Sequence, residues 1–170
     1  MREGESSNWS ITCLGDGANT DAKAWATLDA SLIRRCQHSR VTPPLKVHTP
    51  DPGLWETFTE EVTSISGFRR FLDACFTLFI DGRAEEEALK RYPYLMLAYH
   101  EIRLVRNYFV HGGAKPSTKA VNAWNMLCRR VGKENSDLKL PEEWAALRDA
   151  LLRKMYAALA NAHELLAERR

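Results

Sequence analysis

The residues best suited to chemistry lie in one short stretch, residues 101–113 (EIRLVRNYFVHGG), which contains Arg106 and His111. A fixed guanidinium binds a phosphate and offsets the charge that develops on it during reaction. A histidine that titrates near neutral pH moves a proton to or from a 2′-hydroxyl or a leaving oxygen. These two side chains would suffice for metal-free RNA cleavage, in which the 2′-hydroxyl of the substrate is the nucleophile.

Helical spacing decides which of these side chains meet. Asn107 and His111 are four residues apart and share a helix face. Arg106 precedes His111 by five residues, about 140° around an ideal helix, so the two converge only through the long arginine side chain or where the helix frays at Gly112. The helix dipole favours the charged imidazole, which suits an acid. An arginine and a histidine at a helix end also fit a capping or surface role.

The distribution of charge gives a second functional indication. The net charge is only +2, but residues 102–133 hold seven basic residues and no acidic one. The seven are Arg103, Arg106, Lys115, Lys119, Arg129, Arg130 and Lys133. This window fits either a solvated basic face or a surface that attracts phosphates, with Trp124 or Tyr108 available to stack on bases.

Helices are the elements that must position these residues. Apolar residues at steps of three and four predict helices over residues 20–38, 54–79 and 84–111, with Pro93 splitting or kinking the third. Two further helices are expected, from Pro116 to before Gly132 and from Pro141 to about residue 168. No period-two pattern lasts long enough for a strand. The sequence therefore predicts an all-α bundle of about four core helices with an additional N-terminal helix.

The chain divides by composition into two zones. Residues 1–53 form an N-terminal arm with one helix and a proline-rich connector, residues 41–53, which cannot be helical. Residues 54–170 form the helical bundle.

Several function classes are excluded by what the sequence lacks. The longest apolar stretches, residues 74–80 and 94–99, fall far below the ~20 residues of a membrane span, and no signal peptide is recognised. The four cysteines contain no CxxC pair and are expected to be free thiols in a reducing cytoplasm. No ligand set has metal-site spacing and no phosphate-binding glycine loop is present, so no metal and no cofactor are expected.

The stretch RNYFVHGG (residues 106–113) resembles the motif of HEPN domains, in which an arginine and a histidine are separated by four to six residues. Here four residues separate them, an asparagine follows the arginine, and a small residue follows the histidine. The resemblance covers the motif closely and the bundle loosely. It implies a four-helix bundle that dimerises to bring two motifs into one cleft, and often a metal-independent endoribonuclease. Such proteins act as toxins or in antiviral defence, with a cognate inhibitor or a defence-system partner.

Residue by residue, the resemblance implies that Arg106 and His111 are catalytic and that Asn107 supports them. Glu101 fits the polar position sometimes found upstream of the arginine, and Tyr108 is a further supporting candidate. The RNA-binding candidates are the remaining basic residues of the window: Arg103, Lys115, Lys119, Arg129 and Arg130.

Two other hypotheses stand beside the nuclease. Many HEPN domains are not nucleases, so the chain could be a non-catalytic helical adaptor, an RNA-binding module or a protein-interaction module, in which Arg106 and His111 only stabilise a dimer or hold a partner. The run His100-Glu101-Ile102-Arg103 also resembles the phosphorylated helix of sensor histidine kinases, although Leu104 and Val105 replace the Thr-Pro expected next.

Overall fold

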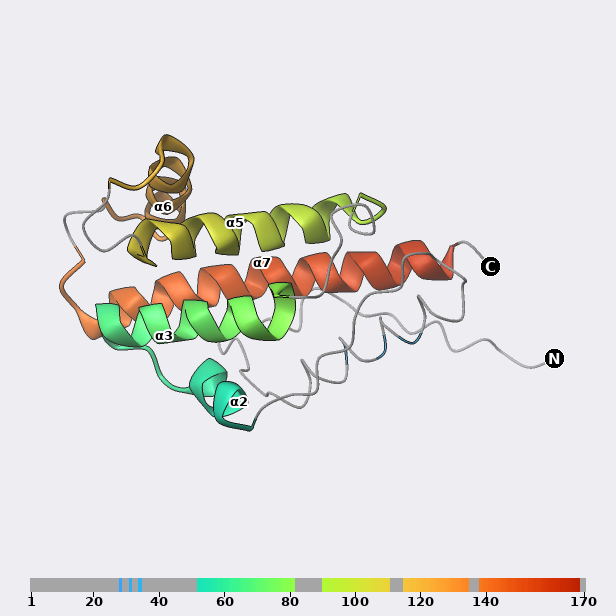
Figure 1. Cartoon of the computed structure of the whole chain (residues 1–170), viewed down its shortest axis with the longest axis horizontal. Helices are drawn as coiled ribbons and strands as arrows, with labels where there is room; N and C mark the ends of the chain where they lie inside the picture. The colour runs from blue at the N-terminus through green and yellow to red at the C-terminus, as the bar shows by residue number, and fades with distance from the viewer. Residues whose placement is uncertain are drawn as a thin grey trace.

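The computed structural model describes residues 52–81, 90–110, 115–134 and 138–168, together with Leu28, Ser31 and Arg34. All regular secondary structure among these residues is helical, which confirms the predicted all-α fold. The elements are α2 (Pro52–Thr59), α3 (Ile65–Cys75), the π-helical turn η2 (Phe76–Ile80) that extends α3, α5 (Pro93–Val110), α6 (Thr118–Arg130) and α7 (Pro141–Ala167). Helices α3, α5 and α7 run alongside one another, as Figure 1 shows.

The predicted continuous helix over residues 54–79 is wrong, because the chain leaves the helix after Thr59 and re-enters it at Ile65. Ser64 has extended backbone angles, and its hydroxyl accepts a hydrogen bond from the Gly67 N–H at 3.2 Å, so it caps α3. Val62 is buried within the non-helical segment. Its burial continues the apolar periodicity across the break and explains why the pattern resembled one helix.

The end of α2 is attached to α7 by a buried arginine. Nη2 of Arg148 donates to the carbonyl oxygens of Phe58 and Thr59, each at 3.4 Å, and its guanidinium lies 5.6 Å from the centre of the Phe71 ring. Burial lowers the pKa of this guanidinium, although the nearby Asp149 carboxylate opposes that effect. Arg148 therefore satisfies carbonyl groups that the end of α2 leaves without helical partners.

Proline sets the start of α5. The helix begins at Pro93 itself, where the missing N–H costs no helical hydrogen bond, so Pro93 starts the helix and does not kink it. Residues 82–89 and 111–114 lie outside the described ranges. The earlier start predicted at residue 84, His111 and the predicted stop at Gly112 are therefore outside them too.

The last two helices have the predicted boundaries within two residues. The hydroxyl of Ser117 accepts from the Ala120 N–H at 3.2 Å and caps α6. After Arg130, Gly132 has a φ of +72°, a conformation that favours glycine at the end of a helix. Helix α7 begins at Pro141, and the carboxylate of Glu143 accepts the N–H groups of Lys139 (2.7 Å) and Leu140 (2.9 Å) just before it.

Glu143 makes the stability of this helix start dependent on pH. The Leu140 N–H, the Lys133 ammonium at 2.7 Å and the Lys139 N–H lower the pKa of its carboxyl from 4.5 to about 2. Because folding depresses the pKa, the stabilisation is present above pH 4.5 and is lost as the pH falls toward 2. We expect Glu143→Gln to be less stable than wild type at pH 7 in urea unfolding, with the difference shrinking as the pH falls. A difference independent of pH would contradict this role.

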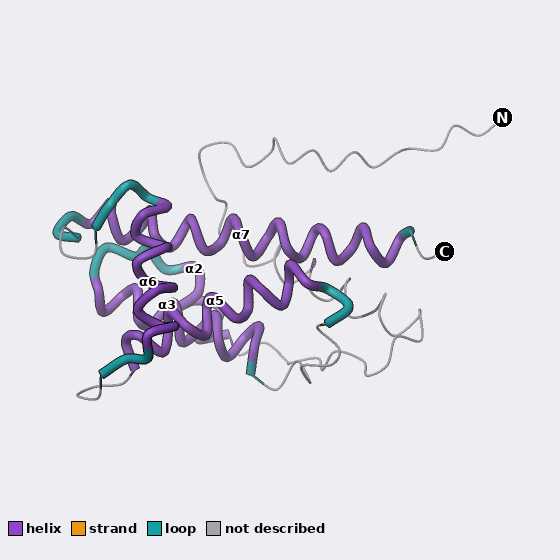
Figure 2. Tube along the Cα trace, turned by 90° about the horizontal axis from the view of Figure 1, so that it is seen from above, coloured by secondary structure: helices purple, strands orange, loops and turns teal. Residues whose placement is uncertain are grey.

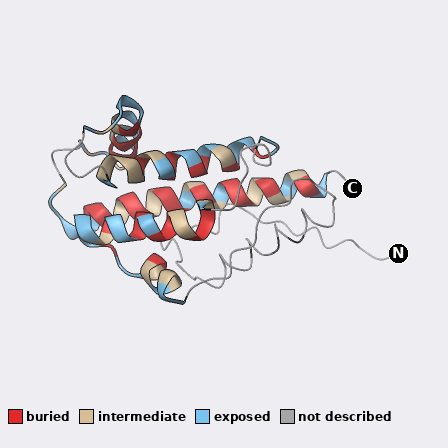
Figure 3. Cartoon of the chain, viewed as in Figure 1, coloured by how far each residue is buried: buried red, intermediate tan, exposed pale blue. Residues whose placement is uncertain are grey.

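The core lies where α3, α5 and α7 meet, and α6 packs across one end of it (Figure 2). Buried and exposed residues alternate along these helices, as amphipathic helices require (Figure 3). The start of α3, the end of α5, α6 and the start of α7 gather at the same end of the bundle (Figure 1). None of the described helices combines the length and the apolar character that crossing a membrane requires.

Part of the predicted N-terminal helix lies within the described residues. Leu28, Ser31 and Arg34 are helical, and Leu28 packs against the core. The carbonyl oxygen of Leu28 lies 2.9 Å from Nε2 of His163 on α7, which gives that histidine a structural contact. The division into an arm, residues 1–53, and a bundle, residues 54–170, stays a prediction because nearly all of the arm lies outside the described residues.

Candidate active site

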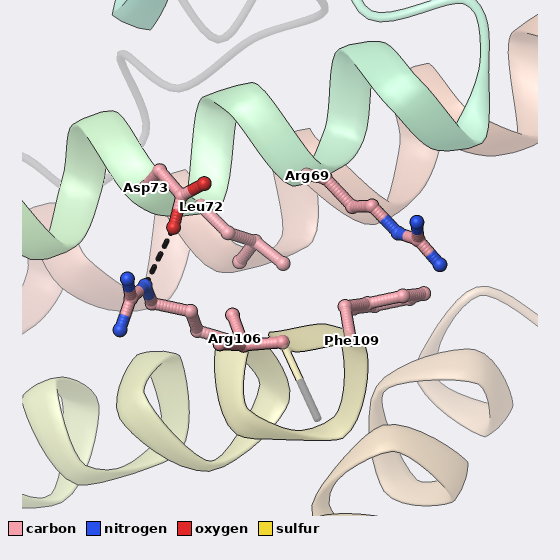
Figure 4. Close-up of a pocket in the computed structure, with 6 residues that line it drawn as sticks. Arg69, Leu72, Asp73, Arg106 and Phe109 are labelled. Atoms are coloured by element: carbon pink, nitrogen blue, oxygen red, sulfur yellow. Dashed lines mark hydrogen bonds and ion pairs between the residues drawn. The ribbon is translucent and has the colours of Figure 1, made fainter. Parts of the chain in front are cut away.

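Arg106 points from α5 toward α3 and is held there by two contacts. Its Nε donates to Oδ1 of Asp73 at 2.6 Å (Figure 4). Its guanidinium also lies 4.4 Å from the centre of the Phe76 ring. The side chains are 27% and 55% exposed, and an ion pair this exposed contributes at most about 1 kcal/mol to stability. The pair therefore orients the guanidinium more than it stabilises the fold.

Arg106 lines a small pocket between α3 and α5. The pocket has a volume of about 200 Å³ and is lined by Arg69, Leu72, Asp73, Arg106, Phe109 and Val110 (Figure 4). Val110 is the last described residue before His111 in the chain. His111, the other predicted catalytic residue, lies outside the described residues, so the structure gives no geometry for the predicted Arg106–His111 pair.

A second, larger hollow adjoins this pocket. Its volume is about 390 Å³, and it is lined by Ile65, Arg69, Tyr108, Phe109, Pro116, Trp124, Leu138 and Trp144. Arg69 and Phe109 line both spaces, with the Arg69 guanidinium 5.4 Å from the centre of the Phe109 ring. The two hollows therefore share one wall, in which the Arg69 guanidinium lies over the Phe109 ring.

The two supporting candidates of the motif have different surroundings. Asn107 is half-buried and lines neither of these two hollows. Tyr108 lines the aromatic hollow and stacks on Trp124, with ring centres 5.4 Å apart and planes 19° apart. Trp124 is almost completely buried, so its main contacts are with other core rings.

Glu101 is buried and connects three helices. Its Oε1 accepts from Nη2 of Arg130 on α6 at 2.7 Å, and its Oε2 pairs with the ammonium of Lys154 on α7. The sequence had suggested that Glu101 supports the catalytic arginine, and the structure places it in a charge network between α5, α6 and α7. The cations of Arg130 and Lys154 balance the negative charge of the buried Glu101 carboxylate. Without them, a charge in this low-dielectric environment would be costly.

Residues 102–133 include no acidic residue, but some of their basic side chains pair with acidic residues from other parts of the chain. Arg106, Arg130 and Lys133 pair with Asp73, Glu101 and Glu143, which all lie outside the window. Arg103 lies 3.0 Å from Nδ1 of His100, so that histidine has a basic neighbour. The exposed Lys115, Lys119 and Arg129 form no ion pair with another described residue.

Other chemistry is limited among the described residues. Burial raises the pKa of the Cys75 thiol and raises that of Cys128 to about 11, so both stay protonated near neutral pH and are poor nucleophiles. Cys13 and Cys36 lie outside the described ranges. Within those ranges, no three His, Cys, Asp or Glu side chains are grouped to hold a metal ion.

The sequence did not identify Arg69 and Asp73 as site residues. They are four residues apart on α3, and this spacing places them on one helix face. That spacing was a usable signal, but only the packing of α3 against α5 shows that this face meets Arg106.

Comparison of the chain with protein-family models, with curated proteins and with solved structures finds no match.

Proposed function

We propose that the protein is a metal-independent endoribonuclease. The observation that carries the proposal is the placement of Arg106, whose guanidinium is held by Asp73 and Phe76 at a pocket that Val110 also lines. Because Val110 is bonded to His111, the second residue of the motif follows the pocket wall directly in sequence. The Arg106–Asp73 bond uses Nε, which leaves the Nη groups to bind a phosphate.

In this proposal the 2′-hydroxyl of the substrate attacks the neighbouring phosphorus. Arg106 holds the phosphate oxygens and stabilises the negative charge that builds on them. The attacking 2′-hydroxyl releases its proton to solvent water, His111 donates a proton to the leaving 5′-oxygen, and the product strand keeps a 2′,3′-cyclic phosphate. Asp73 balances part of the charge of Arg106 and fixes the direction of its planar fork.

A homodimer belongs to the proposal, since the motif of HEPN domains acts in a cleft made by two copies. Aromatic side chains on the segment that carries the motif are candidates for a partner surface: Tyr92 is buried, Tyr94 is exposed and Tyr108 is half-buried. Tyr94 and Leu97, both exposed on α5, are therefore the side chains that favour such a contact. A cytoplasmic toxin or antiviral effector, with a cognate inhibitor or a defence-system partner, is the biological role that this activity fits.

The proposal is tested by incubating the purified protein with single-stranded RNA in excess EDTA. We expect cleavage to persist, because no step requires a metal, and to leave 2′,3′-cyclic phosphate ends, which end-labelling and mass spectrometry identify. Light scattering on the same sample is expected to show a dimer. Products with 5′-phosphates, or activity lost on chelation, would replace this mechanism with a metal-dependent one.

The second candidate function is a non-catalytic helical adaptor. The Arg106–Asp73 ion pair favours it, because a structural arginine at a helix–helix contact makes the same kind of bond. The phosphotransfer hypothesis places the phosphoryl group on His100, an exposed residue near Arg103. Phosphate incorporation at His100 without RNA cleavage would favour phosphotransfer, and absence of both activities would favour the adaptor.

A further inference from the structure

We propose that Arg69 and the aromatic hollow beside it form a subsite for one unpaired nucleobase of an RNA strand, next to the phosphate that Arg106 holds. This inference rests on the proposed function, because it takes RNA as the ligand of the Arg106 pocket. It assigns a substrate-binding role to Arg69, a residue outside the motif.

Arg69 has the surroundings of a stacking arginine. Its side chain is exposed, its guanidinium lies over Phe109, and it pairs with no acid among the described residues. An arginine plane held against a ring on one side can accept a base on its other side, and RNA-binding proteins use both guanidinium planes and aromatic rings for this purpose. Its charge is also available to a neighbouring phosphate.

The continuity of the two hollows fits one nucleotide. The pocket of Arg106 places the charged side chains of Arg69, Asp73 and Arg106 beside apolar ones, whereas Arg69 is the one charged side chain among the described residues that line the adjoining hollow. Four of the eight described residues that line this second hollow are aromatic: Tyr108, Phe109, Trp124 and Trp144. Arg69 stands between the two hollows. A nucleotide has the same order of parts, an anionic phosphate beside a flat apolar base. The hollow, at about 390 Å³, is in the size range of small-molecule sites.

The charges argue for a nucleic acid over an apolar peptide. Among the described residues that line the two hollows, Arg69 and Arg106 are basic and Asp73 is the one acidic residue. An apolar peptide side chain would fill the aromatic part but would remove water from the Arg69 guanidinium without pairing its charge, which is unfavourable. A phosphate with its base satisfies both parts.

The subsite would also select single strands. A base inside an A-form duplex is paired and stacked, and its flat face is not accessible to a side chain. An unpaired base can turn out of the strand and lie on Arg69. Cleavage of loops and single-stranded segments in preference to duplex RNA follows from this geometry.

The test measures binding without cleavage. A short, fluorescently labelled 2′-O-methyl oligoadenylate lacks the attacking hydroxyl, so fluorescence anisotropy reports its affinity alone. We expect Arg69→Ala to weaken binding about tenfold, within the range measured for lost stacking on one base. Arg70→Ala is the matched control, because Arg70 is the next residue on α3, carries the same charge and pairs with Glu60 away from the hollow. It should weaken binding less than twofold.

Substrate variants separate stacking from simple charge attraction. An oligonucleotide with abasic residues should bind wild type about tenfold more weakly, and Arg69→Ala should weaken that binding little further. A duplex of the same length should also bind weakly. Equal effects of Arg69→Ala and Arg70→Ala, or equal affinity for normal and abasic strands, would overturn the subsite, as would binding of an apolar peptide but no RNA.

The two proposals fail in distinguishable ways. If wild type binds the 2′-O-methyl strand through Arg69 but cleaves no RNA in EDTA, the subsite stands and the nuclease proposal is wrong. If wild type cleaves RNA and Arg69→Ala behaves like Arg70→Ala in binding, the nuclease stands and the subsite is wrong.

Discussion

Arg106→Ala and His111→Ala are each expected to slow RNA cleavage by about 100-fold or more while the protein stays folded. The histidine variant loses the proton donor for the leaving oxygen. The arginine variant loses the phosphate clamp and also leaves the Asp73 carboxylate without its partner in the same pocket, where it repels the substrate. Single-turnover cleavage of a labelled single-stranded RNA measures both effects.

Retention of the fold is expected because the Arg106–Asp73 pair is half exposed and contributes little to stability. Arg106→Lys should recover part of the rate, since a point charge attracts a phosphate but cannot bind Asp73 and the phosphate with one planar fork. Arg70→Ala serves as the control for a lost positive charge on the neighbouring helix. If His111→Ala cleaves RNA at the wild-type rate, the nuclease assignment to this motif is wrong and the adaptor takes its place.

The sequence predicted the helices well wherever a local signal marks the boundary. Pro141 and Gly132 set the start of α7 and the end of α6 through their own backbone preferences. These two boundaries could therefore be predicted from the residues at the helix ends alone. The break before α3 was missed because Val62 stays buried in a non-helical segment and so preserves the apolar period. Ser64 caps α3 and so marks where the helix begins. Several other serines and threonines lie nearby in the sequence, and each of them is an equally plausible cap from sequence alone.

The surroundings of the site could be predicted less well, because charges pair across helices. An acid-free window along the chain indicated an unopposed basic face, yet Glu101 binds Arg130 and Asp73 binds Arg106 over separations of 29 and 33 residues. A count of charges along one stretch of sequence does not include partners that lie so far away in the chain. Arg69 was missed for the same reason, since only the packing of α3 on α5 places it over Phe109.

Trp124→Ala is expected to lower the free energy of unfolding by about 3–5 kcal/mol, the usual cost of removing a large buried ring. Trp124 is 1% exposed and contacts four other rings. They are Phe68, Tyr108, Phe109 and Trp144. These rings come from α3, α5 and α7, so the neighbours cannot all move into the cavity without separating helices. Urea unfolding followed by circular dichroism measures the loss.

Met126→Ala is the matched control, because Met126 lies on the same helix but is 60% exposed and should change stability by less than about 0.5 kcal/mol. For a chain of this length, the loss from Trp124→Ala corresponds to a fall in Tm of roughly 6–20 °C. A loss no larger than that of Met126→Ala would show that the ring does not hold the helices together. Since Trp124 packs against Phe109, whose ring lies under the Arg69 guanidinium, the variant should also bind the 2′-O-methyl strand more weakly at temperatures where it remains folded. In contrast to Trp124→Ala, Arg106→Ala should greatly slow cleavage and should change the free energy of unfolding only slightly.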